Sequence, residues 1–370
     1  MTALKRLSLT DFRSHAALTL PITHQAVCLY GPNGAGKTNI LEALSLLGPG
    51  RGLRSAPLPE LARKNGAGGW TIAAHLDNDV RIGVGFGQGA GAPKREIRID
   101  GAVASASDLA EWVRIVWLTP AMDGVFRGGA SDRRRFFDRQ VLAHRTDHGR
   151  YASHYEKAMR ERNALFERDQ VDPVWADAIE LRMAEAAAYI AVNRSDVLVR
   201  LQAAVDERPE GPFPKGDLNL DGPLETLAAE GATASDLVDH SVQELRQGRR
   251  RDAAAGRTLF GPHRTDLKVV HRPTGAPAGD ASTGQQKALL IGLILANARA
   301  LQHKAGGPSP LILLDEAAAH LDQNRRAALF QELTSLGGQA WLTGTEAFLF
   351  EPFADRAQLI EVSAGDAQEE

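Results

Sequence analysis

The pattern of apolar and polar residues predicts strands near the N-terminus of the chain. Residues 2–9 alternate between apolar and polar side chains, which is typical of a half-buried strand. A fully apolar run over 26–30 predicts a buried strand, and the apolar positions over 37–47 recur at the spacing of a helix. Residues 70–100 predict a β-rich segment in which Asp100-Gly101 suits the turn of a hairpin.

The middle of the chain has the periodicity of helices. From about 130 to 205 apolar residues recur at helical spacing, and Asp172-Pro173 interrupts them. We therefore expect two helices packed as a hairpin, then a break rich in proline and glycine over 208–223, then more helix to about 250. No long uninterrupted heptad run occurs in this part of the chain, which excludes an extended coiled-coil arm.

The C-terminal part alternates between predicted helices and strands. A helix is expected over 285–302, and the all-apolar run over 311–314 suits a strand in a buried parallel sheet. A helix over 322–336 and a strand over 339–343 follow. Strands that alternate with helices in this way predict an α/β domain.

Composition and charge narrow the class of protein. The 370 residues allow two or three domains, and contents of 43% hydrophobic and 24% charged residues are ordinary for a soluble globular chain. The net charge of −3 gives no overall signal of nucleic-acid binding, so DNA contacts would come from local basic patches. The single cysteine, Cys28, cannot form an internal disulfide, and no signal peptide or membrane-spanning run is visible. We expect a cytoplasmic protein with no membrane partner.

The segment between the strand over 26–30 and the helix over 37–47 matches the phosphate-binding loop pattern GxxxxGK[ST]. Its residues are Gly31, Pro32, Asn33, Gly34, Ala35, Gly36, Lys37 and Thr38. Glycines let backbone N–H groups approach the phosphates of ATP, and the start of a helix favours their negative charge. We expect Lys37 to contact the β- and γ-phosphates and the Thr38 hydroxyl to bind Mg²⁺. The alternative is an ordinary glycine turn.

Two acids, Asp315 and Glu316, follow the apolar run over 311–314. A carboxylate at the end of a buried strand is unfavourable unless it holds an ion, so Asp315 is predicted to bind Mg²⁺, directly or through water. Glu316 is predicted to position or deprotonate the water that attacks the γ-phosphate. Lys37 and Glu316 are thus the expected catalytic residues, and a plain strand end is the alternative for the two acids.

The segment Ser282, Thr283, Gly284 and Gln285 resembles the signature sequence of ABC-type ATPases. Ala281 and Thr283 depart from its commonest form, Leu-Ser-Gly-Gly-Gln. Serine and glycine at a helix start present a hydroxyl and N–H groups to a γ-phosphate. In that superfamily these groups come from the opposite subunit, so the resemblance predicts a homodimer that buries two ATP molecules. A simple helix cap is the alternative.

Three other positions bear on the dimer and on phosphate sensing. Asp322 matches the loop that crosses the dimer interface, and the role of a helix N-cap is compatible with it. The usual switch histidine is absent and Thr343-Gly344-Thr345-Glu346 stands in its place, so a threonine is expected to sense the γ-phosphate. No glutamine stands at the metal-sensing position, where residues 116–120 read Val-Trp-Leu-Thr-Pro.

The two parts of the predicted ATP site lie at opposite ends of the chain, which indicates an inserted domain. The expected fold class is α/β: an ABC-type P-loop ATPase head with a mixed sheet, helices and an antiparallel β subdomain, and an inserted, mainly helical lobe. The head is expected to comprise residues 1–124 and 256–370, and the lobe residues 125–255.

Five further segments, in the same order, make nearly the whole chain similar to the RecF family of bacterial recombination and repair ATPases. They are Asp11-Phe12-Arg13, the segment 48–55, Leu118-Thr119-Pro120, the segment 133–138 and the segment 261–267. The last reads Gly-Pro-His-Arg-Thr-Asp-Leu and is close to the family's GPHR-x-D-L sequence. Each segment alone is weak evidence, and their combination is specific.

The resemblance implies a function that the residue pattern alone does not give. Members of this family form ATP-dependent dimers that bind double-stranded DNA near single-strand gaps. They act with RecR and RecO to help load RecA, which connects them to repair, replication, recombination and the SOS response. The resemblance also implies a weak, DNA-stimulated ATPase whose hydrolysis of ATP switches the dimer.

Two basic clusters are the predicted DNA contacts. Arg51 and Arg54 form one, and Arg133, Arg134 and Arg135 form the other. Their contacts would be to phosphates, independent of sequence and sensitive to salt. The alternative for the first cluster is a solvated loop or structure near ATP, and for the second a helix face paired with the nearby acids Asp132 and Asp138.

Other ATPase classes remain as rivals. The ATPase subunit of a membrane transporter would have a much shorter gap between the phosphate loop and the signature, and a switch histidine. An ATPase of phage defence with a fused nuclease would need an acidic metal-binding domain after the head. Another ABC- or SMC-type ATPase of DNA maintenance is the nearest alternative. A module that binds nucleotide without hydrolysis is disfavoured by Glu316.

Overall fold

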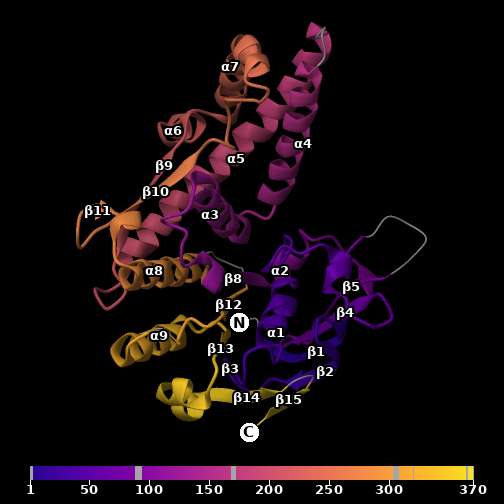
Figure 1. The fold of residues 1–370 in the computed structure, drawn as a ribbon, viewed down its shortest axis with the longest axis vertical. Helices are drawn as coiled ribbons and strands as arrows, with labels where there is room; N and C mark the ends of the chain where they lie inside the picture. Colours follow the sequence, from indigo (N-terminus) through magenta and orange to yellow (C-terminus); the bar gives the residue numbers. More distant parts are fainter. Residues whose placement is uncertain are drawn as a thin grey trace. The chain divides into compact units, whose positions relative to one another are not determined.

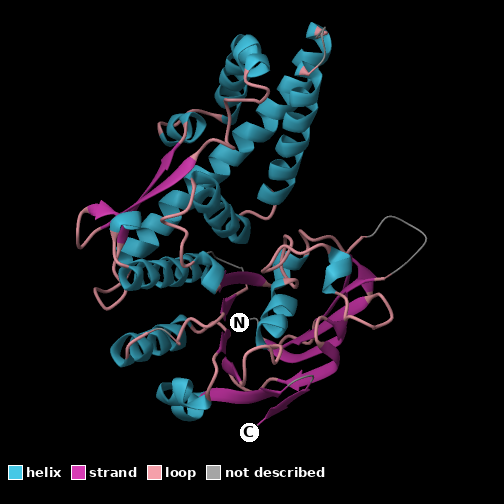
Figure 2. Ribbon diagram, viewed as in Figure 1, coloured by secondary structure: helices cyan, strands magenta, loops and turns pink. Residues whose placement is uncertain are grey.

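The computed structural model describes residues 3–87, 94–167, 172–302, 308–319, 321–363 and 366–369. Contacts within the chain divide it into two compact units. Unit 1 holds Met1–Asp123, Pro209–Phe213 and Leu290–Glu370, and unit 2 holds Gly124–Arg208 and Pro214–Leu289. Figure 1 colours the elements along the sequence, and Figure 2 separates the helices from the strands.

A six-stranded sheet in unit 1 has the order β15-β14-β3-β13-β12-β8. Its strands are β3 (Ala26–Tyr30), β8 (Arg114–Leu118), β12 (Pro310–Leu314), β13 (Ala340–Thr343), β14 (Ala357–Ser363) and β15 (Asp366–Glu369). All neighbours pair in parallel except β14 and β15. Every residue of β3, β12 and β13 is buried, as their apolar sequences predict. The carboxyl ends of these parallel strands meet at one edge, where ligands of such sheets bind.

A second six-stranded sheet in unit 1 is antiparallel throughout, with the order β2-β1-β4-β5-β6-β7. Its strands are β1 (Leu4–Phe12), β2 (His15–Pro21), β4 (Trp70–Leu76), β5 (Arg81–Phe86), β6 (Glu96–Ile99) and β7 (Ala102–Val103). Buried and exposed residues alternate along β4, which gives the sheet one apolar face. The hairpin turn predicted at Asp100-Gly101 is confirmed, with positive φ angles of 49° and 85°.

The helices of unit 1 connect these sheets. They are α1 (Lys37–Ser45), α2 (Leu109–Trp112), α9 (Gln323–Leu336) and the 3₁₀ helices η1 (Leu58–Leu61), η2 (Pro120–Met122) and η4 (Ala347–Arg356). The helix predicted over 322–336 is confirmed, because α9 starts after its N-cap Asp322 and ends at Gly337, whose φ is 62°. Helix α8 (Thr283–Gln302) begins in unit 2 and ends in unit 1.

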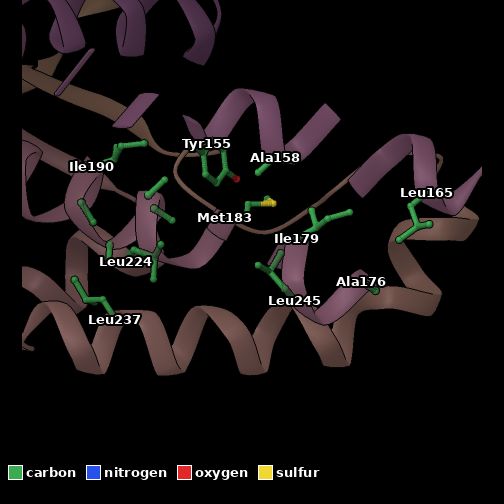
Figure 3. Close-up of a cluster of buried hydrophobic side chains, with 14 residues drawn as sticks. Tyr155, Ala158, Leu165, Ala176, Ile179, Met183, Ile190, Leu224, Leu237 and Leu245 are labelled. Carbon is green, nitrogen blue, oxygen red and sulfur yellow. The ribbon is translucent and has the colours of Figure 1, made fainter. Parts of the chain in front are cut away.

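Unit 2 is mainly helical, as the sequence predicts. Its helices are α3 (Ala130–His144), α4 (His148–Phe166), α5 (Pro173–Glu207), α6 (Pro223–Ala229) and α7 (Ala234–Ala254). Helices α4 and α5 form the predicted hairpin, and α6 and α7 pack on its apolar side around Met183, Ile179 and Leu245 (Figure 3). In the described part of the chain no helix is both long and apolar enough to span a membrane.

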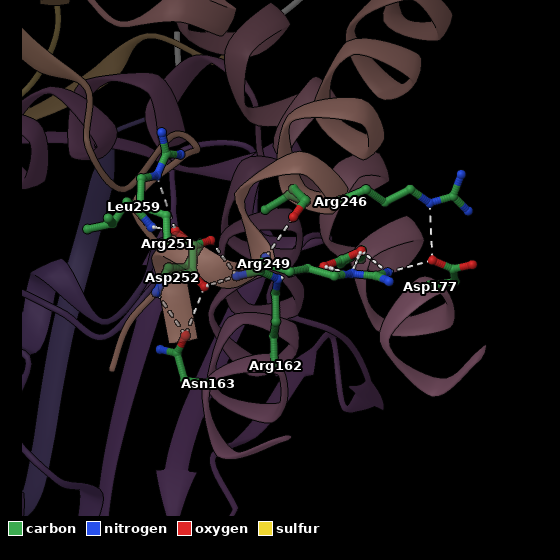
Figure 4. A network of polar contacts seen from close by, with 11 residues as sticks. Arg162, Asn163, Asp177, Arg246, Arg249, Arg251, Asp252 and Leu259 are labelled. Carbon is green, nitrogen blue, oxygen red and sulfur yellow. Dashed lines mark hydrogen bonds and ion pairs between the residues drawn. The ribbon is translucent and has the colours of Figure 1, made fainter. Parts of the chain in front are cut away.

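A buried polar network joins three helices of unit 2. Arg162 of α4 is fully buried and donates hydrogen bonds to Glu180 of α5 at 3.0 Å and to Asp252 of α7 at 2.7 Å. It also donates to the Thr258 hydroxyl at 2.9 Å and to the Leu245 carbonyl at 2.9 Å (Figure 4). Such a network fixes the register of the helices because a charge left without partners in this interior would be costly.

The segment after α7 stays in unit 2 and adds strands to a small sheet. Strand β10 (Asp266–His271) pairs with β9 (Gly216–Asp221) and with β11 (Ala276–Pro277), which the 3₁₀ helix η3 (Ala278–Asp280) follows. The ring nitrogen Nδ1 of His263 lies 2.6 Å from the Tyr155 hydroxyl of α4. These contacts group residues 256–289 with the helical lobe, so the expected domain boundary at 255/256 does not coincide with the division by contacts at 289/290.

Candidate nucleotide-binding site

The loop between β3 and α1 has the backbone of a phosphate-binding loop. Gly31, Gly34 and Gly36 have positive φ angles of 141°, 83° and 110°. A Cβ atom on Gly31 would lie 2.3 Å from a backbone carbonyl oxygen of β14, and one on Gly36 would lie 2.7 Å from the Ser14 hydroxyl. Only glycine fits these two positions, as expected of a loop whose backbone lies close to phosphate groups.

Lys37 is buried at the start of α1, with 5% of its surface exposed. Its Nζ donates hydrogen bonds to the carbonyl oxygens of Gly31 at 2.6 Å and of Pro32 at 2.8 Å. Burial lowers the pKa of the ammonium group, while the negative charges of Glu316 and Asp315 oppose that shift. The ammonium therefore lies inside the loop, where phosphate oxygens would take the place of the two carbonyls.

Thr38 and Asp315 converge from opposite ends of the sequence. The Thr38 hydroxyl lies 2.9 Å from Asp315 Oδ1 and 3.2 Å from Oδ2. Asp315 is 6% exposed, and its N–H donates to the Leu118 carbonyl of β8. A hydroxyl and a carboxylate this close are the oxygen ligands that Mg²⁺ prefers when phosphates complete its shell. The residues present therefore fit the predicted metal.

Glu316 follows Asp315 in an unusual backbone conformation. Its φ is 51°, in the left-handed region that residues with a Cβ atom rarely adopt. Its N–H donates to the Thr343 hydroxyl at 2.8 Å, and that hydroxyl lies 2.8 Å from Asp315 Oδ1. Thr343, in the segment expected to sense phosphate, thus contacts both predicted acids.

Helix α1 carries a charge cluster around a buried glutamate, which the sequence does not predict. Glu42 is 1% exposed and accepts two hydrogen bonds of 2.9 Å from the Arg13 guanidinium. It also accepts one of 2.8 Å from Arg54, which donates a further bond to the Asn39 side chain at 3.0 Å. A glutamate among the apolar residues of α1 was the signal for this cluster. Arg54 is therefore tied to the phosphate-loop helix, and Arg51 is exposed on the same loop.

The second basic cluster is largely committed to contacts within unit 2. Arg133 forms a two-pronged ion pair with Asp266, at 2.7 and 2.8 Å, and Arg134 donates to the Thr265 carbonyl at 2.7 Å. The side chain of Arg135 is 70% exposed and lies 3.6 Å from Asp132. The alternative of pairing with nearby acids holds for Arg135, whereas Arg133 pairs with an acid distant in sequence. Arg135 is the member most accessible to DNA.

Asp138, the other acid proposed as a partner for that cluster, pairs elsewhere. Both of its carboxylate oxygens accept hydrogen bonds from Arg194 of α5, at 2.7 and 2.8 Å. Burial alone would raise the pKa of Asp138, but Arg194 and His148 outweigh burial and lower it. This carboxylate therefore stabilises the helical lobe in its ionised form.

The signature segment forms the start of α8 in unit 2. The Ser282 hydroxyl accepts from the Gln285 N–H at 3.3 Å, and the Gln285 side chain accepts from the Ser282 N–H at 2.9 Å. This reciprocal pair is a capping box. Thr283 and Gly284 lie exposed between these residues, at the positively polarised end of a helix of 20 residues. The capping role is thus present, and the segment remains open to a ligand.

Asp322 also caps a helix, as the sequence allows. Its side chain accepts from the Arg325 N–H at 2.9 Å and is 59% exposed. The exposed carboxylate leaves the predicted role at a dimer interface compatible with the cap. That interface role is a prediction.

Comparisons with known proteins agree with this geometry. Residues 3–352 match the model of the RecF/RecN/SMC N terminal domain family. The chain is 52% identical over 368 residues to the DNA replication and repair protein RecF of Brucella suis biovar 1 (strain 1330), covering 98% of this chain and 95% of that protein. It is 51% identical over 369 residues to RecF of Mesorhizobium japonicum (strain LMG 29417 / CECT 9101 / MAFF 303099), covering 98% and 97%.

The fold is also similar to a solved structure, that of the recombination mediator protein RecF-ATPrS in the RecFOR pathway. The TM-score is 0.85 at 21% sequence identity, and the match covers 100% of this chain and 98% of that one. At this identity the likeness supports the fold. It agrees with the predicted combination of an ATPase head, an antiparallel β subdomain and a helical insertion.

Proposed function

Because the chain belongs to the RecF family, we propose that it is a DNA replication and repair ATPase that dimerises around ATP on double-stranded DNA. The observation that carries the proposal is the convergence of Thr38 and Asp315 beside the buried ammonium of Lys37. This geometry supports binding of a nucleotide with Mg²⁺. Family membership disfavours the transporter and phage-defence alternatives.

The chemistry proposed is hydrolysis of the γ-phosphate of ATP. The Lys37 ammonium would neutralise charge on the β- and γ-phosphates, and Glu316 would orient the attacking water or take its proton. The Thr38 hydroxyl and the Asp315 carboxylate would hold Mg²⁺, which when bound would offset the negative charge of the phosphates. Positioning and charge neutralisation of this kind supply most of the catalysis in phosphoryl transfer.

A second copy of the chain is proposed to complete each site. The exposed start of α8, with the N–H groups of Thr283 and Gly284 beside the Ser282 cap, supports this role because helix starts bind anions. The exposed carboxylate of Asp322 would lie at the same interface. Nucleotide that binds across two subunits favours the dimer by mass action, so hydrolysis would return the dimer to monomers.

The proposed nucleic-acid ligand is double-stranded DNA next to a single-strand gap. Arg51 and Arg54 remain candidates, and the hydrogen bond from Arg54 to Glu42 holds the Arg54 guanidinium against the phosphate-loop helix. From the second cluster Arg135 is favoured by its exposure, while Arg133 and Arg134 would have to exchange contacts within the protein. All such contacts would weaken steeply with salt.

The proposed partners are RecO and RecR, with RecA loading as the outcome. The support is the family and the description of the similar structure as a mediator in the RecFOR pathway. Recombinational repair and induction of the SOS response would follow from RecA loading at gaps. The expected location is the cytoplasm, where the chromosome lies.

The experiment that tests the proposed function measures ATP hydrolysis and DNA binding with one set of proteins. Wild type should hydrolyse ATP slowly with Mg²⁺ and faster with gapped duplex. Asp315→Asn and Lys37→Ala should lose hydrolysis by at least about 100-fold, since the first removes a charged ligand of Mg²⁺ and the second removes a positive charge that stabilises the phosphates. A wild type that neither hydrolyses ATP nor binds duplex DNA would contradict the proposal. Arg160→Met in unit 2, at an exposed side chain, is the control variant and should hydrolyse ATP like wild type.

A further inference from the structure

A buried threonine connects the two acids of the candidate site. Thr343 is the last residue of β13, which pairs in parallel with β12, the strand that ends before Asp315. Thr343 is 1% exposed. The N–H of the next residue, Gly344, donates at 2.9 Å to the Leu29 carbonyl of β3, the strand that leads to the phosphate loop. Thr343 is therefore held between both strands that carry ATPase motifs.

The Thr343 hydroxyl both accepts and donates a hydrogen bond. Its oxygen accepts a hydrogen bond from the Glu316 N–H at 2.8 Å, and its proton is donated to Asp315 Oδ1 at 2.8 Å. A hydroxyl has one proton to donate. Since the oxygens of a γ-phosphate need donors, a proton already given to Asp315 does not suit the sensing role expected of a threonine in this segment.

The hydrogen bond from the Glu316 N–H to Thr343 matters because of the backbone conformation of Glu316. A φ of 51° is unfavourable for a residue with a Cβ atom and persists where surrounding contacts hold it. The Thr343 hydroxyl binds the N–H of that residue directly. Because the side chain leaves the backbone at this turn, whatever fixes the turn also fixes the direction in which the Glu316 side chain starts.

We propose that Thr343 is a positioning residue for ATP hydrolysis, which orients the Asp315 carboxylate toward Mg²⁺ and holds the Glu316 turn. The inference rests on the proposed ATPase function and deepens it. Thr38 also donates to Asp315, at 2.9 Å, but its hydroxyl must turn its lone pairs to the metal to serve as a ligand. The bond from Thr343 needs no such change, so it keeps Asp315 oriented with or without nucleotide.

The test compares variants with and without the hydroxyl. Thr343→Val removes the hydroxyl at nearly constant volume, Thr343→Ser keeps it, and Thr71→Val is the control at an exposed threonine of β4, outside the candidate site. We would measure kcat and KM for ATP, the Mg²⁺ concentration for half-maximal activity, and the affinity for a fluorescent ATP analogue in EDTA. Thermal unfolding shows that each variant is folded, and Thr343→Ala is a second hydroxyl-free variant should valine disturb folding.

For Thr343→Val we expect kcat to fall by about 10–100-fold and the Mg²⁺ requirement to rise by about 10-fold, the effects typical of losing a partner of a metal ligand. Affinity in EDTA should not change, and Thr343→Ser should recover most of the activity. Equal losses in the valine and serine variants at position 343, or an equal loss in Thr71→Val, would overturn the role. An inactive wild type would instead refute the proposed function, whereas an active wild type matched by Thr343→Val would refute only this inference.

Discussion

Replacing Arg162 by methionine should strongly destabilise the helical lobe. The guanidinium is fully buried and donates four hydrogen bonds to groups of α5, α7 and the chain after α7 (Figure 4). Methionine fills a similar volume but leaves Asp252, 1% exposed, without its partner at 2.7 Å. Glu180 keeps the guanidinium of Arg249. Asp252 is left with the Leu259 N–H at 3.2 Å and the mostly exposed Arg251 guanidinium at 3.9 Å, so it is the carboxylate that loses most.

The size of the effect can be worked from the loss of the buried ion pair between Arg162 and Asp252. Removing one member of a buried ion pair costs about 3–5 kcal/mol, because the remaining charge loses its partner and stays out of water. For a unit of this size the midpoint of thermal unfolding should fall by about 6–20 °C. Arg160→Met, on the same helix, is the matched control. Its side chain is 70% exposed and lies 3.9 Å from Glu156, so the change should stay within about 0.5 kcal/mol.

Urea unfolding followed by far-ultraviolet circular dichroism measures the difference between the two variants. A third variant, Arg162→Met combined with Asp252→Leu, removes both charges and should recover about 1–3 kcal/mol relative to the sum of the single changes. If Arg162→Met is no less stable than Arg160→Met, the network does not stabilise the lobe and the reasoning fails.

Three further outcomes follow from the structure. Gly36→Ala should lower ATP affinity by about 10-fold or more in a direct binding assay, because the residue has a φ of 110° and its Cβ would lie 2.7 Å from the Ser14 hydroxyl. Arg135→Ala should weaken binding to all duplex sequences alike and reduce the salt slope by about 1, whereas Arg133→Ala should cost about 1–3 kcal/mol of stability. Burial opposes ionisation of Asp266, but the hydrogen bond from Arg133 favours it, and the pKa of Asp266 is lowered from 3.8. The contribution of this ion pair to the free energy of unfolding is therefore full above pH 3.8 and is lost as pH falls through the lowered pKa. In unfolding measured against pH, Asp266→Asn should reduce the loss of stability at acid pH.

The parts of the site that the sequence predicts are those encoded by neighbouring residues. The loop over 31–38 and the acids at 315 and 316 stand next to apolar strands, and runs such as 311–314 are buried because a parallel sheet is covered on both faces. Local chemistry also allows a cap at Asp322 and, as the alternative to the signature role, one at Ser282, and the structure contains both caps.

The parts that escape prediction depend on register between distant segments. Thr343 reaches Asp315 only because β13 lies beside β12, and Arg133 reaches Asp266 across 133 positions of sequence. Pairing of β9 with β10 likewise groups residues 256–289 with the helical lobe, which a helical pattern ending near 255 does not indicate. The spacing of residues along the sequence does not show which distant segments pair.

The central claim is that ATP joins two copies of this chain, and sizing by light scattering tests it most directly. The proteins are wild type, Glu316→Gln, which should bind ATP without hydrolysing it, and Glu316→Gln combined with Ser282→Arg, which places a bulky side chain at the start of α8. Each is measured with ATP and Mg²⁺, with and without gapped duplex. We expect Glu316→Gln to form a stable dimer that DNA promotes and that the added Ser282→Arg abolishes. Monomers in every condition would contradict the shared site.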